Sequence, residues 1–180
     1  MQPTTVTLAK LAEFIATPVS GQQFFVADCA RSDRILPLLK SQEMSAFATI
    51  YGASDAQLFG EAGPVLVELT GNVRLATALL DNGWGDAWGI YMASRVGFKS
   101  LRQHLSRLTV AELPDQRLAM FRFYDPRVIG AYLASCNKSE RTHFFGPIDW
   151  IMYEVEGAAQ WETPQQPTNT IRIVHDSHKA

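Results

Sequence analysis

The sequence predicts an α/β fold, a layered domain in which a central mixed β-sheet of about five strands is flanked by helices. Apolar runs of strand length alternate along the chain with longer segments in which apolar residues recur at helical spacing. That alternation is typical of layered α/β domains. Several links between these segments are short, which favours a mixed sheet over a purely parallel one.

Most of the predicted elements lie in the first two thirds of the chain. Apolar periodicity predicts helices around residues 8–15, 35–39, 72–83 and 98–108, and strands over 24–27, 46–51, 63–70 and 87–92. Asp33 is a candidate N-cap for the second helix, in which Pro37 is tolerable only within the first turn. Gly71 and Asn72 open the third helix, and Gly83 ends it.

A fifth strand is predicted to lead directly into a helix. Residues 118–124 alternate, with Ala119, Phe121 and Phe123 expected on one face and Met120, Arg122 and Tyr124 on the other. Asp125 is a favoured N-cap and Pro126 a favoured first helical residue, because the cap oxygen accepts a bond from an unpaired backbone amide and proline has no such amide. The helix that follows has one apolar stripe, made of Val128, Ile129, Tyr132, Leu133 and Cys136.

The candidate partner-binding residues are Arg122, Tyr124, Asp125, Arg127, Phe144 and Phe145. Arg122 lies among apolar neighbours, so its charge is either paired, with Asp28 as one candidate, or turned toward a partner. Arg127 lies off the apolar stripe in a first helical turn, where the helix dipole disfavours a cation. An internal salt bridge and an interface role both account for it.

The aromatic pair Phe144 and Phe145 precedes Gly146 and Pro147. Paired aromatics at a turn either plug the core of their own domain or contact a partner. The chain is predicted to form a single α/β domain over residues 1–160, followed by a short polar C-terminal tail over residues 161–180. In that tail, residues 170–174 alternate like a strand, which either frays or adds to an exposed sheet edge.

Composition excludes several function classes. The net charge is −2 and the basic residues are scattered, which speaks against nucleic acid as a partner. No apolar run approaches the length of a membrane span, and the start of the chain lacks a secretory signal pattern, so a cytoplasmic location is expected. Two cysteines and four histidines show no metal-ligand spacing, and neither a nucleophile motif nor a phosphate-binding loop occurs. The expectation is a protein without cofactor, metal or catalytic residues, although Cys29 could still meet His104 or His143 in space.

Three short blocks carry a family resemblance: Leu113-Pro-Asp115, Phe121-Arg-Phe-Tyr-Asp-Pro-Arg127 and Phe144-Phe-Gly-Pro147. Their order resembles the adaptor chaperones of bacterial type VI secretion, long catalogued as a domain of unknown function. Further similar blocks are Phe25-Val-Ala-Asp28, Ala62 to Leu69, Trp88 to Ser94, and His104-Leu105. The chain departs from the family pattern at Gln116, where the turn usually has glycine.

The resemblance implies a non-enzymatic adaptor in the cytoplasm of a Gram-negative bacterium. Such adaptors bind a toxic effector and help load it onto the valine-glycine-repeat spike, VgrG. Two other classes stay open. A small-molecule-binding or hydrolytic α/β domain would have a deep pocket with convergent polar groups, and an immunity-type protein would bind the active site of a toxin.

Overall fold

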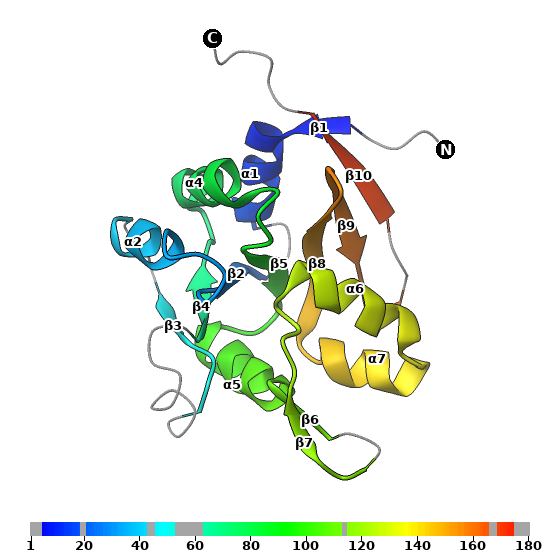
Figure 1. Ribbon diagram of the computed structural model, residues 1–180. Helices are drawn as coiled ribbons and strands as arrows, with labels where there is room; N and C mark the ends of the chain where they lie inside the picture. Colours follow the sequence, from blue (N-terminus) through cyan, green and yellow to red (C-terminus); the bar gives the residue numbers. More distant parts are fainter. Residues whose placement is uncertain are drawn as a thin grey trace.

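The structure is a computed structural model that describes residues 5–18, 21–42, 46–52, 63–112, 115–165 and 169–174. A central sheet separates two layers of helices (Figure 1). The strands of this sheet, in spatial order, are β1 (Thr5–Thr7), β10 (Asn169–Val174), β9 (Ala158–Glu162), β8 (Ile148–Val155), β5 (Gly89–Ser94), β2 (Gln22–Asp28), β4 (Pro64–Glu68) and β3 (Phe47–Thr49). The layered α/β class is confirmed, but the described residues form a sheet of eight strands where about five were expected.

The sheet is mixed, as predicted, although most of its pairs are antiparallel. Only β1 and β10 run parallel among the described strand pairs. Asn169–Val174 pairs with β9, so the strand-like segment near the C-terminus docks on the sheet of its own chain. The division of the chain at residue 160 stays a prediction.

The hairpin of β8 and β9 was not predicted from the sequence. Its two-residue turn is Glu156-Gly157, and both residues have positive φ, 40° and 78°. Two left-handed residues in succession match the right-handed twist of an antiparallel pair, and glycine adopts that conformation without steric cost. Gly157 is the part of this turn that the sequence signals, whereas Glu156 stands where asparagine, aspartate or glycine is usual.

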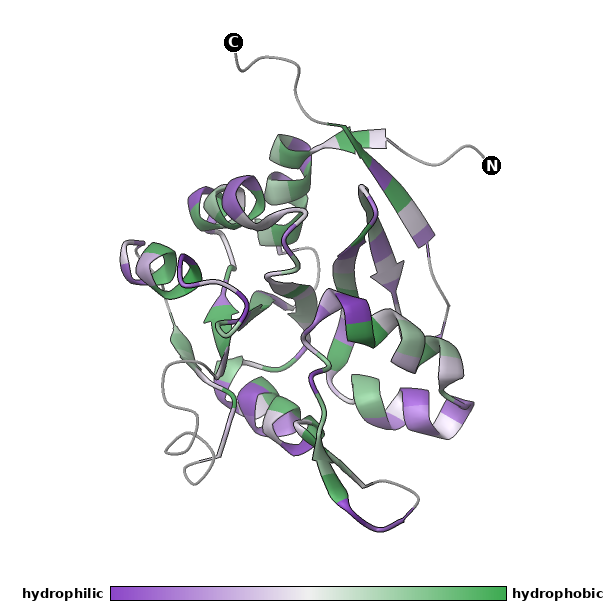
Figure 2. Cartoon of the chain, viewed as in Figure 1, coloured by the Kyte–Doolittle hydropathy of each residue, from purple (hydrophilic) through white to green (hydrophobic). Residues whose placement is uncertain are grey.

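Both faces of the central strands are buried. Along β2, Phe24 and Val26 point into one core and Phe25 and Ala27 into the other. The first core is shared with α5 (Phe98–Leu108), α6 (Pro126–Ser135) and α7 (Lys138–Phe145), and the second with α1 (Leu8–Ala16), α2 (Ile35–Lys40) and α4 (Val73–Gly83). Helix surfaces carry alternating polar and apolar bands (Figure 2), because each helix has one face toward the sheet and one toward solvent.

The helix starts confirm part of the capping prediction. Asn72 caps α4, since its side chain accepts from the backbone amide of Leu75. Asp33 does not cap α2: the residue before that helix is Arg34, and no side-chain cap bond is present. Pro37 is the third residue of α2 and so lies in the first turn, as expected.

The helix α7 was missed by the sequence analysis, although its start carries a clear signal. Asn137 accepts from the backbone amides of Ser139 and Glu140, and the Glu140 carboxylate accepts from the amide of Asn137. This reciprocal arrangement is a capping box, and asparagine followed three residues later by glutamate is its sequence pattern.

The prediction of a strand over residues 118–124 was wrong in length and in place. Only Leu118–Met120 form a strand, β7, which pairs with β6 (Val110–Glu112) in a separate two-stranded hairpin that projects from the body (Figure 1). The alternation continued into residues 121–124 because Phe123 and Tyr124 are buried in the core, and Phe121 partly so, from an irregular segment. Gln116, in the connection of this hairpin, has a φ of 67°, a left-handed conformation that glycine adopts more easily.

Candidate functional site

The site begins at Asp125, which joins the irregular segment to α6. Its Oδ1 atom accepts from the backbone amide of Arg127 at 3.0 Å, and Pro126 is the first helical residue. The predicted cap and helix start are confirmed. Because Asp125 has an extended backbone and Pro126 cannot donate, the chain turns sharply from the segment into the helix at this point.

Arg127 forms a two-bond ion pair with the same carboxylate. Its Nε donates to Oδ1 of Asp125 at 2.9 Å and its Nη2 donates to Oδ2 at 2.6 Å. This pair offsets the unfavourable position of a cation in a first helical turn. The Arg127 side chain is still 55% exposed, so the internal salt bridge and an outward-facing guanidinium coexist.

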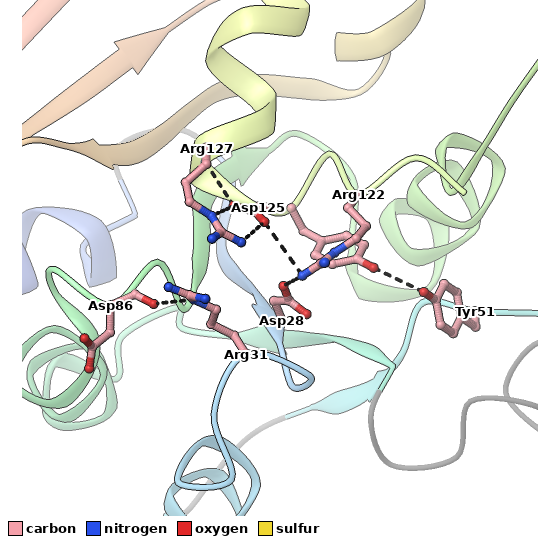
Figure 3. A network of polar contacts seen from close by, with 8 residues as sticks. Asp28, Arg31, Tyr51, Asp86, Arg122, Asp125 and Arg127 are labelled. Atoms are coloured by element: carbon pink, nitrogen blue, oxygen red, sulfur yellow. Dashed lines mark hydrogen bonds and ion pairs between the residues drawn. The ribbon is translucent and has the colours of Figure 1, made fainter. Parts of the chain in front are cut away.

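Arg122 lies in the irregular segment and not in a strand, which corrects the earlier expectation. Its Nη2 donates to Oδ2 of Asp28, the last residue of β2, and lies 3.7 Å from Oδ2 of Asp125. Asp28 is therefore the partner of Arg122, as the sequence suggested. The arginine thus links the end of β2 to the start of α6 (Figure 3).

These contacts shift the ionisation of the groups involved. Burial raises the pKa of Asp125, but the hydrogen bonds and charge of Arg127 outweigh it, and the net pKa lies below the usual aspartate value. The pKa of Arg122 is raised because its bond to Asp28 and the charge of that carboxylate outweigh the desolvation of the guanidinium. Both groups are therefore charged at neutral pH.

The remaining predicted site residues are inside the protein. The Tyr124 hydroxyl lies 3.1 Å from the hydroxyl of Tyr51, and both rings are buried. Phe144 and Phe145 are buried in the core that α5, α6 and α7 share with the sheet, where Phe144 meets Phe123 edge to face. Tyr124, Phe144 and Phe145 are buried, whereas Arg122 and Arg127 are exposed on either side of Asp125. The junction of the irregular segment with α6, residues 122–127, is called the hinge below.

Arg31 belongs to the same surface and was missed by sequence reasoning. Its backbone amide donates to the carbonyl of Asp28 at 2.9 Å, which places it in the turn directly after β2. Its Nε donates to the backbone carbonyl of Asp86 at 2.9 Å (Figure 3). The available signal was its position, three residues after the strand end that also provides Asp28.

The resulting surface presents arginines and hides aspartates. The side chains of Asp28 and Asp125 are 1% and 3% exposed, whereas those of Arg122 and Arg127 are 44% and 55% exposed. A partner that approaches the hinge therefore meets guanidinium groups. Guanidinium matches carboxylate geometry closely, so this arrangement is suited to binding acidic groups.

A groove of about 870 Å³ adjoins the hinge. It lies between α6 and the β8–β9 hairpin, and its lining includes Arg31, Arg127, Ala131, Ala134 and Val155. The volume is in the range of pockets that bury a small ligand or part of a peptide. Arg127 is the one predicted site residue that lines it.

The described residues contain no group of three or more histidine, cysteine, aspartate or glutamate side chains placed to hold a metal ion. In the same part of the chain, no helix combines the length and the apolar character needed to cross a membrane.

Comparison with known proteins gives one family match. No curated protein matches the chain, and no solved structure does. The profile of a family described as a domain of unknown function, DUF4123, matches residues 23–143. This range runs from the start of β2 to α7 and contains Asp28, Arg122, Asp125 and Arg127. Because the match covers more than half of the chain, the protein belongs to the DUF4123 family.

Proposed function

We propose that this chain is a non-enzymatic adaptor that binds a type VI secretion effector and helps load it onto the VgrG spike. The observation that carries the proposal is membership of the DUF4123 family over residues 23–143. The blocks around Asp125 and Phe144 resemble those of type VI adaptor chaperones, and that resemblance implies effector and spike as partners. The place of action implied by the resemblance is the bacterial cytoplasm.

The hinge surface supports a role in protein binding. Arg122 and Arg127 are held by buried carboxylates, so their orientation is set before any partner arrives. Preorganised side chains lose less conformational entropy on association, and arginine is enriched at protein interfaces. The exposed groups at the hinge are basic, which favours a partner with acidic groups. An immunity-type protein is expected to have an acidic or shape-matched patch, and the basic surface argues against the acidic form of it.

One observation favours a second candidate, a small-molecule-binding or hydrolytic domain. The groove beside α6 has the volume of a ligand site and includes polar groups from Tyr153, Glu154 and Glu162. The Glu154 carboxylate accepts from the backbone amides of Gly85 and Ala87, and Glu162 is paired with Arg141. These carboxylates are engaged in holding the fold, which makes the adaptor the better-supported function.

The test is binding of candidate effector and spike proteins from the organism that encodes this chain. Each is purified and titrated with the full chain, and delivery of the effector is measured in cells that lack the chain. We expect direct binding of the effector and loss of its delivery in those cells. Turnover of ester, phosphate or peptide substrates by the purified chain, together with no binding of either partner, would refute the proposal in favour of the hydrolytic alternative.

A further inference from the structure

Two arginines beside the groove, Arg31 and Arg127, retain hydrogen-bond donors that no described residue of the protein accepts. A guanidinium has five N–H donors. Arg127 gives its Nε and Nη2 groups to Asp125, and Arg31 gives its Nε to the carbonyl of Asp86. Both side chains are exposed and both line the groove beside α6. Their remaining donors are therefore available to acceptors that enter the groove.

Two carboxylates near this groove are already engaged within the fold. Glu154 accepts from the backbone amide of Gly85 at 2.6 Å and from that of Ala87. Glu162 is buried and accepts from Arg141 at 2.6 Å. Glu156 is exposed, but it lies at the turn of the β8–β9 hairpin and repels acidic groups there. Arg31 and Arg127 are the exposed cations among the described residues that line the groove, and they attract a carboxylate that enters it, with Glu154 as a competing partner of Arg31.

Part of the groove wall is apolar. Ala131 and Ala134 face the groove from α6, on the side of the helix that is exposed to solvent. Surface helices usually present long polar side chains there. On the opposite wall, Val155 is an exposed large hydrophobic residue. An occupant therefore gains apolar contacts along the groove in addition to ion pairs at the arginines.

The size of the groove favours an extended chain as the occupant. An extended residue with its neighbours at sheet spacings occupies roughly 160 Å³, since it rises about 3.3 Å and packs about 4.8 Å by about 10 Å across. The groove of about 870 Å³ then accommodates about five such residues. The same space holds fewer than about two turns of helix, because a helix with its side chains is about 10–12 Å wide.

We propose that this groove binds an extended segment of the effector that carries side-chain carboxylates. The carboxylates bond to Arg31 and Arg127, and small apolar side chains of the segment lie between α6 and Val155. This inference rests on the proposed adaptor function and deepens it, because it names the chemistry of the bound segment.

The test compares groove variants with matched controls in binding to the effector that the preceding titration identifies. The variants are the double substitution Arg31→Ala with Arg127→Ala, which removes the donors, and Ala131→Trp, which fills the groove. Arg74→Ala is the control for charge, because Arg74 is the exposed second residue of α4 as Arg127 is of α6. Ser135→Trp is the control for bulk, because Ser135 is exposed on α6 outside the groove.

We expect both groove variants to weaken effector binding by about tenfold or more, as loss of central interface arginines does, while both controls bind like the original chain. Melting curves come first. If the double variant melts early, Arg31→Ala alone is used, since the Arg31 side chain bonds a surface carbonyl and is no part of the α6 cap.

A second measurement identifies the bound segment. Overlapping peptides that tile the effector are bound to the chain, and each binder is repeated with aspartate and glutamate replaced by asparagine and glutamine. We expect the amide versions to lose binding, because they keep the shape of the segment and remove its charge.

The outcomes separate the two proposals. Failure of the original chain to bind the effector would overturn the adaptor function and the groove proposal together. Effector binding that neither groove variant weakens leaves the adaptor function standing and overturns the groove proposal. Equal binding of the amide peptides overturns the carboxylate chemistry. A dimer of the chain that dissociates on Ala131→Trp, measured by light scattering, would mean that a second copy occupies the groove and overturns the assignment to the effector.

Discussion

Arg127 is held by Asp125, only two residues before it, through two parallel hydrogen bonds of 2.9 and 2.6 Å. The same carboxylate caps α6 by accepting from the backbone amide of Arg127. One aspartate therefore ends the irregular segment, starts the helix and orients an exposed guanidinium. Local stability and the proposed recognition surface depend on the same side chain.

We predict that Asp125→Ala lowers the free energy of unfolding by about 1–2 kcal/mol, the usual cost of losing an N-cap. Asp125→Asn is the control, because asparagine keeps the cap acceptor and removes the charge. Urea unfolding of both variants measures the difference. An Asn variant as unstable as the Ala variant would show that the ion pair with Arg127, and not the cap, provides the stability.

The two arginines of the hinge are expected to differ in their effect on stability. Arg122→Ala leaves Asp28 buried without its guanidinium, and we expect a loss of about 2 kcal/mol, within the range for an unsatisfied buried polar group. Arg127→Ala removes a side chain that is 55% exposed and leaves Asp125 near Arg122 and bonded to the backbone amide of residue 127, so it is expected to cost less than about 1 kcal/mol. Adding Asp28→Asn to Arg122→Ala should recover part of the loss. Equal melting temperatures for the two single variants would contradict the distinction.

His104 predicts a dependence of stability on pH. Burial lowers its pKa below the ordinary value of 6.5, although its hydrogen bond to the carbonyl of Phe144 acts in the opposite direction. Below pH 6.5 His104 binds a proton in the unfolded chain but not in the folded one. The free energy of unfolding therefore decreases as the pH is lowered, until the pH reaches the pKa of His104 in the folded chain. Unfolding at pH 7.5 and at pH 5.5 measures the loss. His104→Gln keeps a donor for the carbonyl of Phe144 and should lose less stability between the two pH values. An equal loss in this variant would show that His104 does not cause the pH dependence.

Gly146 is expected to tolerate no side chain. Its φ is 47°, and a Cβ atom would lie 2.5 Å from Cε1 of His104. Gly146→Ala should cost about 2–4 kcal/mol, from left-handed strain together with overpacking. The control is Gly71→Ala, at a φ of 73° with open space around the added Cβ, which isolates the backbone strain of about 1–2 kcal/mol. Equal losses for both variants would show that contact with His104 contributes nothing.

Periodicity and capping chemistry determined most of the local structure in advance. Residues near one another in the chain determine the cap at Asp125 and the start of α4 at Asn72. They also determine the strands β2, β3, β4 and β5. Such signals are local, because a cap oxygen, a proline ring or an apolar stripe acts on backbone groups within a few residues. The strand prediction over residues 118–124 was wrong because buried aromatic side chains imitate alternation without a partner strand.

The tertiary structure alone decided which segments meet. The order of strands in the sheet, the docking of Asn169–Val174 beside β9 and the position of Arg31 at the hinge all join residues far apart in sequence. The ion pair of Arg122 was foreseen as a possibility, but its choice of Asp28, 94 residues away, required the fold. The order of residues along the chain determines which charges meet only when they are a few residues apart. The groove beside α6 forms when this helix and the β8–β9 hairpin have folded next to each other.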